Sequence, residues 1–542
     1  MLTPFVAPPA DYYQANCRTV FQFVLDQYAP LLDGASRAQL GSYLHASDDA
    51  QRLFARLLTR KGPIYRIDSL SYKEVADLPR ALNELEASLL IQINPRLAAD
   101  NALNILRKSE LQNLVPELPA PLRRGRKRDL IDHFCTRFSD VQLCNAVSNA
   151  AAYLTMKEPR IWRTALMLFF GRTGQDFSAF VTRDLGMMTY ETVEIEAQYG
   201  SRSELRYALA LSELNRLTRR VSDFDHLQSE LPRDLLRALS SLQLDNRWLN
   251  NRRQRGLSRL AQHFERQALY DDALCAYAQV QQHPARERQV RILKKMALDD
   301  QASNLLQEIR ACPWSQAEAL FAERFGKRNG GFQPDVQTFD IDRVDAECRI
   351  EEQAMGILLQ QSNVAWVAYV ENSLVRTLTG LFYWPLIFTP IQGAFTNPFQ
   401  AAPNDLYADD FLQARQHVLE ELESRYACDE SMYQGMREVA QSKRGIANPL
   451  VSWGLLEQLT LDDLLALIPA DDIRALAACV IRNLPERRTG LPDLLVAYMD
   501  GAYAFVEVKG PNDQLQPGQR IWLQTFQDLH IDAWVMRLRI AT

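Results

Sequence analysis

One short segment near the C-terminus constrains the fold of this chain more than any other feature of its 542 residues. Residues 494–498 and 503–508 are rich in aliphatic and aromatic residues, and a turn signal, Met-Asp-Gly, lies between them. This pattern predicts a β-hairpin. A two-residue loop would turn Asp493 away from Glu507, whereas a three-residue loop with Gly501 in the left-handed conformation places them opposite each other. We predict the three-residue loop, or an equivalent bulge.

The polar residues of this hairpin form a chemically specific set. Asp493 follows Pro492, and Glu507 and Lys509 flank Val508, so they share one face of a strand. Carboxylates hold Mg²⁺ or Mn²⁺, and a lysine can polarise a water molecule or stabilise negative charge that builds up on a phosphate. The set therefore predicts a metal-dependent nuclease site. The alternative is an ordinary exposed hairpin whose lysine has a buried stem.

The sequence around the hairpin extends the pattern. Residues 488–494, 506–513 and 519–523 read RTGLPDL, VEVKGPND and QRIWL, and they resemble the virus-type replication-repair (VRR) nuclease domain. Upstream motifs resemble the Fanconi-anaemia-associated nuclease family: FFG at 169–171, QDFSAFV at 175–181, DLG at 184–186 and GLFYWPLIF at 380–388. The resemblance covers most of the chain. It implies an enzyme that cuts branched DNA near 5′ flaps, digests DNA from 5′ ends and acts in interstrand cross-link repair.

The resemblance also assigns roles to single residues. The family has an acidic ligand on a helix before the hairpin, and Glu371 matches that position; Leu374, Leu378 and Phe382 follow at helical spacing, which would place Glu371 on the buried side of the helix. One or two Mg²⁺ or Mn²⁺ ions would be held by Glu371, Asp493, Glu507 and the carbonyl of Val508. Lys509 would orient or activate the attacking water.

Two further residues beside the hairpin have weaker claims to the site. Asp513 could support it or simply cap the turn after the second strand, and Gln519 could position a phosphate or a water molecule. Pro517 is well placed to start the helix that carries Gln519, and residues 533–538 read as a closing strand.

Two groups of basic residues in the first quarter of the chain are candidates for contact with DNA. The first forms a basic turn between two short helical segments and resembles the SAP DNA-binding module; it comprises Lys108, Arg123, Arg124, Arg126, Lys127 and Arg128. Such a turn would bind phosphates, so binding would be sensitive to salt and nearly indifferent to sequence. The alternative is a solvated loop. The second group, Arg60, Lys61 and Arg66, is either another phosphate-tracking surface or the polar side of a small helical domain.

The remaining sequence predicts a multidomain, mostly α-helical protein. A hydrophobic content of 47% is ample for several cores. Leu260, Tyr270, Ala273 and Tyr277 have spacing typical of a tetratricopeptide repeat (TPR), with generic helical packing as the alternative. We predict an N-terminal helical DNA-binding region at 1–95, a SAP-like module with adjoining helices at 96–195 and TPR-like repeats at 196–340. An α/β nuclease domain of PD-(D/E)xK type with a mixed sheet would follow at 341–542.

Composition bounds the cellular setting. The eight cysteines include no CxxC pair, which argues against structural zinc and suits a reducing compartment. Eukaryotic relatives carry an N-terminal zinc finger for ubiquitin, so the missing pattern suggests a bacterial type. The N-terminus lacks the blocks of a signal peptide, and prolines interrupt the apolar stretch 378–395, which reads as domain core and not as a membrane span. We expect a cytoplasmic bacterial protein that joins the nucleoid during repair.

These observations predict a 5′-flap endonuclease and 5′-to-3′ exonuclease that acts on branched or flapped double-stranded DNA. The net charge of −6 does not oppose this, because the distribution of basic residues decides DNA binding. No protein partner is indicated. The alternatives are a nuclease of other specificity, such as a junction resolvase or restriction enzyme, and a DNA-repair scaffold that does not cut.

Overall fold

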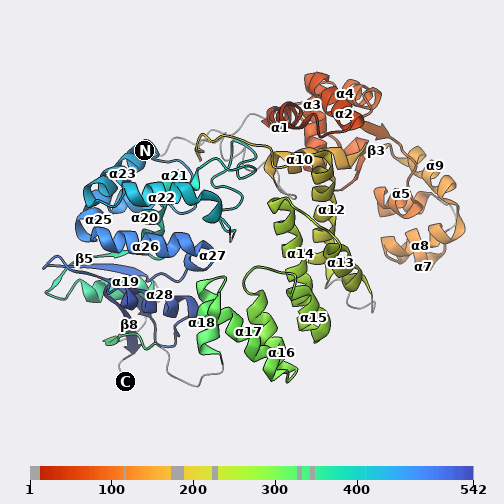
Figure 1. Cartoon of the computed structure of the whole chain (residues 1–542). Helices are drawn as coiled ribbons and strands as arrows, with labels where there is room; N and C mark the ends of the chain where they lie inside the picture. The colour runs from red at the N-terminus through yellow and green to blue at the C-terminus, as the bar shows by residue number, and fades with distance from the viewer. Residues whose placement is uncertain are drawn as a thin grey trace. The chain divides into compact units, whose positions relative to one another are not determined.

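The computed structural model describes residues 12–60, 62–114, 118–171, 188–221, 230–325, 332–341, 348–408 and 410–540. The chain forms two compact units. The first comprises Met1–Met187 with Tyr199–Leu205, and the second comprises Met188–Gln198 with Arg206–Thr542. The elements of each unit are labelled in Figure 1.

The first unit begins with helices that share one aromatic core. They are α1 (Tyr12–Tyr28), α2 (Gly34–His45), α3 (Asp48–Thr59), α4 (Leu78–Ala87) and α10 (Pro159–Phe170), with a short η1 (Ile67–Ser69). Trp162 of α10 packs against Phe21 of α1 and Phe54 of α3, with ring centroids 5.2 and 4.6 Å apart. Three short antiparallel strands lie beside these helices in the order β1-β3-β2: β1 (Ile64–Arg66), β2 (Ile91–Ile93) and β3 (Tyr153–Met156).

A group of short helices with its own core completes the first unit. They are α5 (Ala99–Ile105), α6 (Lys108–Asn113), α7 (Ala120–Arg124), α8 (Lys127–Arg137) and α9 (Asp140–Ala150). Leu103, Leu111, Leu130 and Phe134 are buried together in this core. The predicted basic turn needs a correction here, because its residues end α7 and begin α8, with the break at Gly125. The SAP assignment itself stays a prediction.

Most of the second unit before its sheet is an array of helices. They are α12 (Arg202–Arg219), which begins in the first unit, α13 (Leu231–Ser240), α14 (Arg247–Arg266), α15 (Tyr270–Tyr277), α16 (Ala285–Lys295), α17 (Asp299–Ala311) and α18 (Gln316–Arg324). Helices α14 and α15 pack as a pair, with Leu260, Phe264, Ala273 and Tyr277 all buried. Stacked helix pairs were expected in this region, and their identity as tetratricopeptide repeats stays a prediction.

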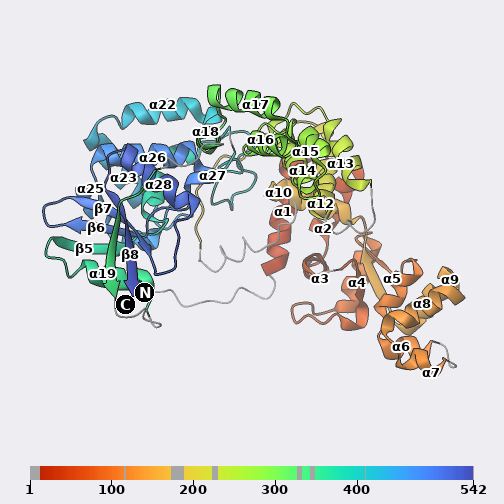
Figure 2. The same cartoon turned by 90° about the horizontal axis from the view of Figure 1, so that it is seen from below.

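A five-stranded mixed sheet follows, as predicted, in the order β4-β8-β7-β6-β5. The strands are β4 (Val336–Ile341), β5 (Val364–Tyr369), β6 (Leu494–Tyr498), β7 (Tyr503–Lys509) and β8 (Ala533–Ile540). β8 runs parallel to β4 and β7, while β6 is antiparallel to β5 and β7. Helix α19 (Ile350–Leu358) covers one face through Ala354 and Leu358. Helix α28 (Pro517–Asp528) covers the other face, where Phe526 stacks on Phe505 (Figure 2).

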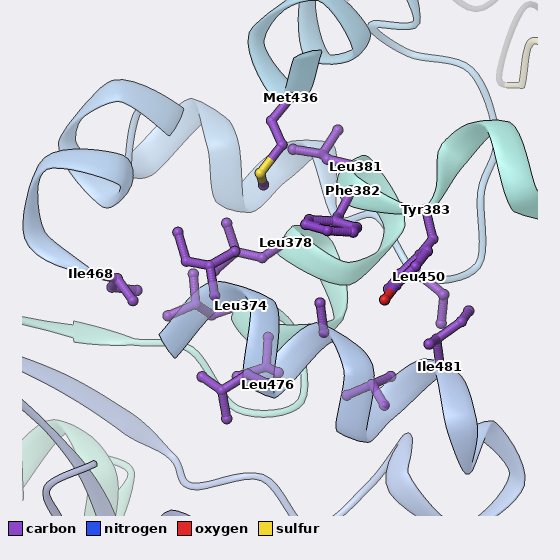
Figure 3. Close-up of a cluster of buried hydrophobic side chains, with 14 of the residues drawn as sticks. Leu374, Leu378, Leu381, Phe382, Tyr383, Met436, Leu450, Ile468, Leu476 and Ile481 are labelled. Atoms are coloured by element: carbon purple, nitrogen blue, oxygen red, sulfur yellow. The ribbon is translucent and has the colours of Figure 1, made fainter. Parts of the chain in front are cut away.

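The remaining helices pack together beside the α28 face of the sheet. They are α20 (Leu374–Phe382), α21 (Trp384–Ile387), η3 (Gln413–Arg415), α22 (Gln416–Arg425), α23 (Asp429–Ser442), α24 (Trp453–Gln458), α25 (Leu461–Leu467), α26 (Ala470–Arg482) and α27 (Leu484–Arg487). Figure 3 shows Leu378 and Phe382 of α20 facing Leu476 and Ile481 of α26 in this core. The apolar stretch 378–395 thus belongs to domain core, as expected. Among the described residues, no helix is long and apolar enough to cross a membrane.

Candidate active site

The hairpin register places the acidic residues opposite each other. Leu494 pairs with Val506 and Ala497 with Tyr503, so Asp493, one residue before β6, comes opposite Glu507. Residues 499–501 form the loop, Gly501 has a φ of +87°, and the N–H of Tyr498 donates to the carbonyl of Ala502 at 2.8 Å. The predicted three-residue loop is confirmed. A left-handed residue at its end allows the tight return that keeps this register.

Asp493 is held by the backbone on the far side of the hairpin. Its side chain is 8% exposed, and its Oδ2 accepts the N–H of Val508 at 2.9 Å. Burial raises the pKa of Asp493 to about 6, against the lowering effect of that hydrogen bond. The charges of Glu371 and Glu351 raise the same pKa further, so several acidic groups lie within electrostatic reach of this carboxylate.

Glu507 is almost fully buried, with 1% of its surface exposed. Its Oε1 accepts from Lys509 Nζ at 2.9 Å and from Gln519 Nε2. Its Oε2 is buried and has no hydrogen-bond partner among the described residues. Burial, followed by the charge of Asp493, raises the pKa of Glu507 to about 8. A buried oxygen without a partner, next to a second carboxylate, is an arrangement that a bound cation would stabilise.

Lys509 completes the constellation predicted from the sequence. It lies on the same side of β7 as Glu507, is 8% exposed, and contacts Glu507 directly. The valines that alternate with these residues, Val506 and Val508, belong to the core beneath α19, as predicted. The structure therefore brings Asp493, immediately before β6, together with Glu507 and Lys509 on the neighbouring strand β7.

Glu371 does not lie on a helix, which corrects the expectation from the sequence. Its neighbour Tyr369 is still paired with Leu494 at the end of β5, and Asn372 has a φ of +51°, so the chain turns here before α20 begins at Leu374. Pairing between strands, which spacing along one segment does not reveal, extends β5 to this point. Glu371 is exposed and accepts hydrogen bonds from the Tyr369 hydroxyl and from Asn372 Nδ2. Its charge still raises the pKa values of Asp493 and Glu507.

Three further residues belong to the description of the site: the two weaker candidates, Asp513 and Gln519, and Glu351, which was not predicted. Asp513 is exposed, and its Oδ2 accepts the N–H of Gly510 at 3.1 Å, so it caps the turn after β7. Gln519, in the first turn of α28, donates to Glu507. Glu351 begins α19, is half-buried, and raises the pKa of Asp493. Glu351 was not predicted from the sequence, because an acidic pair in the first turn of a helix is an ordinary helix signal.

The basic run of the first unit is only partly available to a ligand. Arg128 forms ion pairs with Asp100 at 2.8 Å and Asp132 at 3.0 Å. Lys127 donates to the carbonyl of Asn104 at 2.8 Å, and burial lowers its pKa. In the same run Arg123, Arg124 and Arg126 are exposed, as is the ion-paired Arg128, whereas Lys127 and Lys108 are half-buried.

The described members of the second basic group, Arg60 and Arg66, differ in their partners. Arg66 is half-buried and forms ion pairs with Asp68 and, at 2.5 Å, with Glu110. These two carboxylates raise the pKa of Arg66, and the pairing favours a structural role over contact with phosphate. Arg60 is exposed and donates to the Tyr72 hydroxyl at 3.0 Å. Lys61 lies outside the described residues, as do the motifs at 175–181 and 184–186.

A mixed sheet with an aspartate, a glutamate and a lysine close together is the arrangement expected of a metal-dependent nuclease. Two family models agree: residues 429–539 match the VRR-NUC domain, and residues 11–92 match the FAN1 HTH domain. Nucleases with a VRR-NUC domain depend on divalent metal ions in general.

Similarity to individual proteins extends over the whole chain. A Fanconi-associated nuclease 1 homolog of Pseudomonas aeruginosa is 31% identical, with 98% of this chain and 96% of the relative covered. A homolog of Arabidopsis thaliana is 27% identical over 99% of this chain and 68% of the relative. The crystal structure of paFAN1 bound to 2nt 5′flap DNA with gap superposes with a TM-score of 0.83 at 29% identity, covering 99% of this chain and 100% of that one. The chain belongs to the Fanconi-associated nuclease 1 family and is a DNA nuclease.

Proposed function

We propose that this nuclease cuts 5′-flapped DNA and digests DNA from 5′ ends during repair, including repair of interstrand cross-links. The observation that carries the proposal is the buried set of Asp493, Glu507 and Lys509, with an unpartnered oxygen on Glu507. The structural relative described above was crystallised with 5′-flap DNA, which supports this class of substrate. The division of the chain into four regions at 95, 195 and 340 is part of the same proposal.

The residues present fit a divalent cation. Asp493, Glu507, Glu371 and the carbonyl of Val508 would hold one or two ions, and an all-oxygen set suits Mg²⁺, with Mn²⁺ as a substitute. The raised pKa values of Asp493 and Glu507 support this, because two buried carboxylates without a cation resist ionisation. When bound, the ion stabilises charge on the phosphate and makes a bound water more acidic.

The protein residues orient the reactants. The N–H of Val508 fixes the carboxylate of Asp493, and Gln519 and Lys509 fix one oxygen of Glu507, so the other oxygen is left to face a ligand. Lys509 is placed to orient the attacking water and to stabilise negative charge on the phosphate. In-line attack would leave a 5′-phosphate on the product. In the first unit, Arg123, Arg124 and Arg126 would bind phosphates of the duplex, and Lys108, Lys127, Arg128 and Arg60 are further candidates.

A substrate panel tests this function. The purified protein is incubated with labelled 5′-flap, 3′-flap, four-way junction and linear duplex DNA, in Mg²⁺, Mn²⁺ or EDTA. We expect metal-dependent incision of the 5′ flap that is lost in Asp493→Asn and kept in the control Asp500→Asn, whose carboxylate lies at the exposed tip of the same hairpin. Preferred cutting of the junction would replace the flap assignment with resolution. Binding without cutting in every condition would support a scaffold instead.

A further inference from the structure

His283 lies between two glutamates at the place where the helix array α12–α18 meets the helices α20–α27. Its Nε2 lies 3.4 Å from Glu287 Oε2, and its Nδ1 lies 3.3 Å from Glu486 Oε1. Glu287 belongs to the first turn of α16, whereas Glu486 belongs to α27. The imidazole therefore connects two parts of the second unit that are far apart in the sequence.

Both contacts together require the protonated form of this histidine. Ionised carboxylate oxygens accept hydrogen bonds and cannot donate them, so each ring nitrogen has to donate one. A neutral imidazole carries one N–H, and its second nitrogen would direct a lone pair at a carboxylate oxygen. The imidazolium carries two N–H groups and a charge opposite to that of both partners. Loss of the proton from His283 therefore breaks one of the two contacts.

Acidic groups outweigh burial at this histidine. Burial lowers the pKa of His283. The hydrogen bond to Glu287 and the charges of Glu486 and Glu318 outweigh that effect, so the pKa lies above its usual 6.5. Burial raises the pKa of Glu287, but His283 and Arg291 outweigh it and lower that pKa. Stability from the paired imidazolium is thus fully present below pH 6.5 and is lost as the pH rises through the folded-state pKa of His283.

The other charged groups around His283 form ion pairs. Those on α16, α18, α22 and α26 are Arg291–Glu287 at 2.9 Å, Arg286–Glu318 at 2.6 Å and Arg482–Glu423 at 3.4 Å. Segment 406–412 contributes apolar residues to the cavity beside the histidine, namely Leu406, Ala408, Phe411 and Leu412. Arginine and glutamate titrate far from neutral pH in general, whereas histidine titrates close to it. His283 is therefore the group that makes this junction sensitive to pH.

A second contact between the same two parts does not depend on a histidine. Arg247, at the start of α14, forms an ion pair with Asp405 at 3.1 Å. Beside it, Trp248 Nε1 donates to the carbonyl of Gln392 at 3.0 Å. A Cβ atom at Gly393, which has a φ of +72°, would lie 2.6 Å from that indole nitrogen, so glycine is needed for this approach. The start of α14 is thus anchored independently of the contact at His283.

A cavity beside the histidine gives the junction room to move. Its volume is about 130 Å³, and its lining includes His283, Trp314, Phe411, Arg482 and Glu486. Close-packed interfaces resist displacement, whereas a cavity with polar lining groups admits water. The side chains of His283 and Glu486 also keep 24% and 27% of their surface exposed. Protons can therefore reach the ring, and α27 can shift without disrupting a packed core.

α27 leads directly into the active site. From its end at Arg487 the chain runs through Gly490 to Asp493. Gly490 has a φ of +85°, and a Cβ atom there would lie 3.0 Å from the backbone nitrogen of Gln519. Gln519 in turn donates to Glu507. A shift of α27 would therefore reach both carboxylates of the hairpin through this short segment.

We propose that His283 is a pH-sensitive latch of the nuclease. As the imidazolium it holds the helix array to α27 and keeps the segment before Asp493 in its position for cleavage. As the neutral imidazole it releases α27. The latch therefore supports DNA cleavage at slightly acidic pH and withdraws that support at alkaline pH. This inference goes beyond the proposed function, because it concerns control of the site and requires DNA cleavage of any specificity.

Hydrogen exchange of the DNA-free protein tests the latch without a substrate. Peptides that cover α27 and residues 488–492 are followed in Mg²⁺ at pH 6 and pH 8.5, with correction for the intrinsic exchange rate. Protection in wild type should be about threefold greater at pH 6, since a partly exposed ion pair shifts an equilibrium by a few-fold. His283→Gln should show the lower protection at both pH values. The control His417→Gln, an exposed histidine of α22, should match wild type.

Two exchange results would overturn the proposal. One is equal protection of these peptides in wild type at both pH values. The other is a pH dependence in His283→Gln as large as that of wild type, which would assign the effect to other groups. If His283→Gln does not fold, Glu486→Gln takes its place, because it removes the α27 partner of the histidine and leaves the ring unchanged.

Single-turnover cleavage measures what the latch does for catalysis. Because hydroxide becomes more abundant as the pH rises, the rate of each variant is divided by the wild-type rate at the same pH. His283→Gln and Glu486→Gln should cut about threefold more slowly than wild type at pH 6 and equally fast at pH 8.5. His283→Lys, which stays charged, should cut faster than wild type at pH 8.5. A ratio for His283→Gln that does not change with pH would overturn the latch in favour of a purely structural role.

The choice of DNA keeps this test separate from the proposed function. The comparison uses a labelled 5′ flap, or whichever member of the substrate panel the wild type cuts best. Preferred cutting of another structure would contradict the flap assignment and leave the comparison intact. A protein that cuts no DNA would contradict the proposed function, while hydrogen exchange would still decide the role of His283.

Discussion

The carboxylate of Asp493 accepts the backbone N–H of Val508 at 2.9 Å across the hairpin. This contact ties one acidic residue to the strand that carries the other two members of the site, Glu507 and Lys509. It also opposes, without cancelling, the effect of burial on the pKa of Asp493. The hairpin thereby holds the carboxylates of Asp493 and Glu507 close together and buried, where each is stabilised by binding a proton or a cation.

Stability of the metal-free protein should fall as the pH rises. The pKa of Glu507 is raised to about 8 in the folded protein, so its contribution is fully present below the unfolded value near 4.5 and is lost as the pH rises through 8. The slope is at most about 1.4 kcal/mol per pH unit. Denaturant unfolding at pH 5 to 9 in EDTA measures it, and Glu507→Gln should remove most of the dependence. An equal dependence in that variant would show that other groups cause it.

Lys509→Met should remove cutting and spare metal binding. The substitution keeps the length of the side chain but loses the charge that contacts Glu507 at 2.9 Å. We expect single-turnover cleavage of a 5′ flap to fall roughly 10²-fold or more. Lys294→Met, which removes an exposed lysine on α16, is the control. If Lys509→Met cuts within a few-fold of wild type, Lys509 does not act on the water or the phosphate.

Glu371→Gln tests whether an exposed residue of the β5–α20 turn belongs to the site. Loss of its charge should lower the pKa values of Asp493 and Glu507, because Glu371 raises both. If Glu371 also binds the cation, affinity for Mn²⁺ should fall by about tenfold or more. Glu352→Gln, on the exposed side of α19, is the matched control. Unchanged Mn²⁺ affinity would limit Glu371 to an electrostatic effect.

In the first unit, substitution of exposed arginines should weaken DNA binding, whereas substitution of the ion-paired Arg66 should lower stability. Arg124→Gln/Arg126→Gln removes two exposed charges and should lower DNA affinity, with a salt slope smaller by roughly 1.8. Arg66→Gln breaks pairs with Asp68 and Glu110, so it should cost roughly 1 kcal/mol of unfolding free energy and leave the slope unchanged. Salt-dependent binding and thermal melting of both variants check this. The reverse pattern would place the phosphate contacts at Arg66.

The hairpin could be predicted because local rules determine it. Alternation along residues 503–508 and a glycine at the end of the loop fix both the register and the face of each residue. The family resemblance supplied Glu371 and implied that it lies on a helix, which is wrong for this chain. Spacing to Leu374 suggested a helix, whereas pairing of Tyr369 with Leu494, over a hundred residues away in sequence, keeps the chain extended.

Non-local contacts account for the other differences. Arg66 forms an ion pair with Glu110, 44 residues away in sequence, and the sequence near either residue does not predict this pair. The basic run 123–128 read as one turn, but Gly125 divides it between two helices, and Asp100 and Asn104 of α5 engage part of it. Glu351 was missed because it reaches Asp493 from a helix that begins after a separate segment of chain.

Calorimetric titration of the DNA-free protein with Mn²⁺ at pH 7, in two buffers of different ionisation enthalpy, would show whether the hairpin carboxylates hold the catalytic ion. Since burial raises the pKa of Glu507 to about 8, we predict binding that releases about one proton, and no binding of comparable affinity in Asp493→Asn. Glu507→Gln should bind weakly and release fewer protons. Mn²⁺ binding that is unchanged in both variants would contradict the assignment of the site.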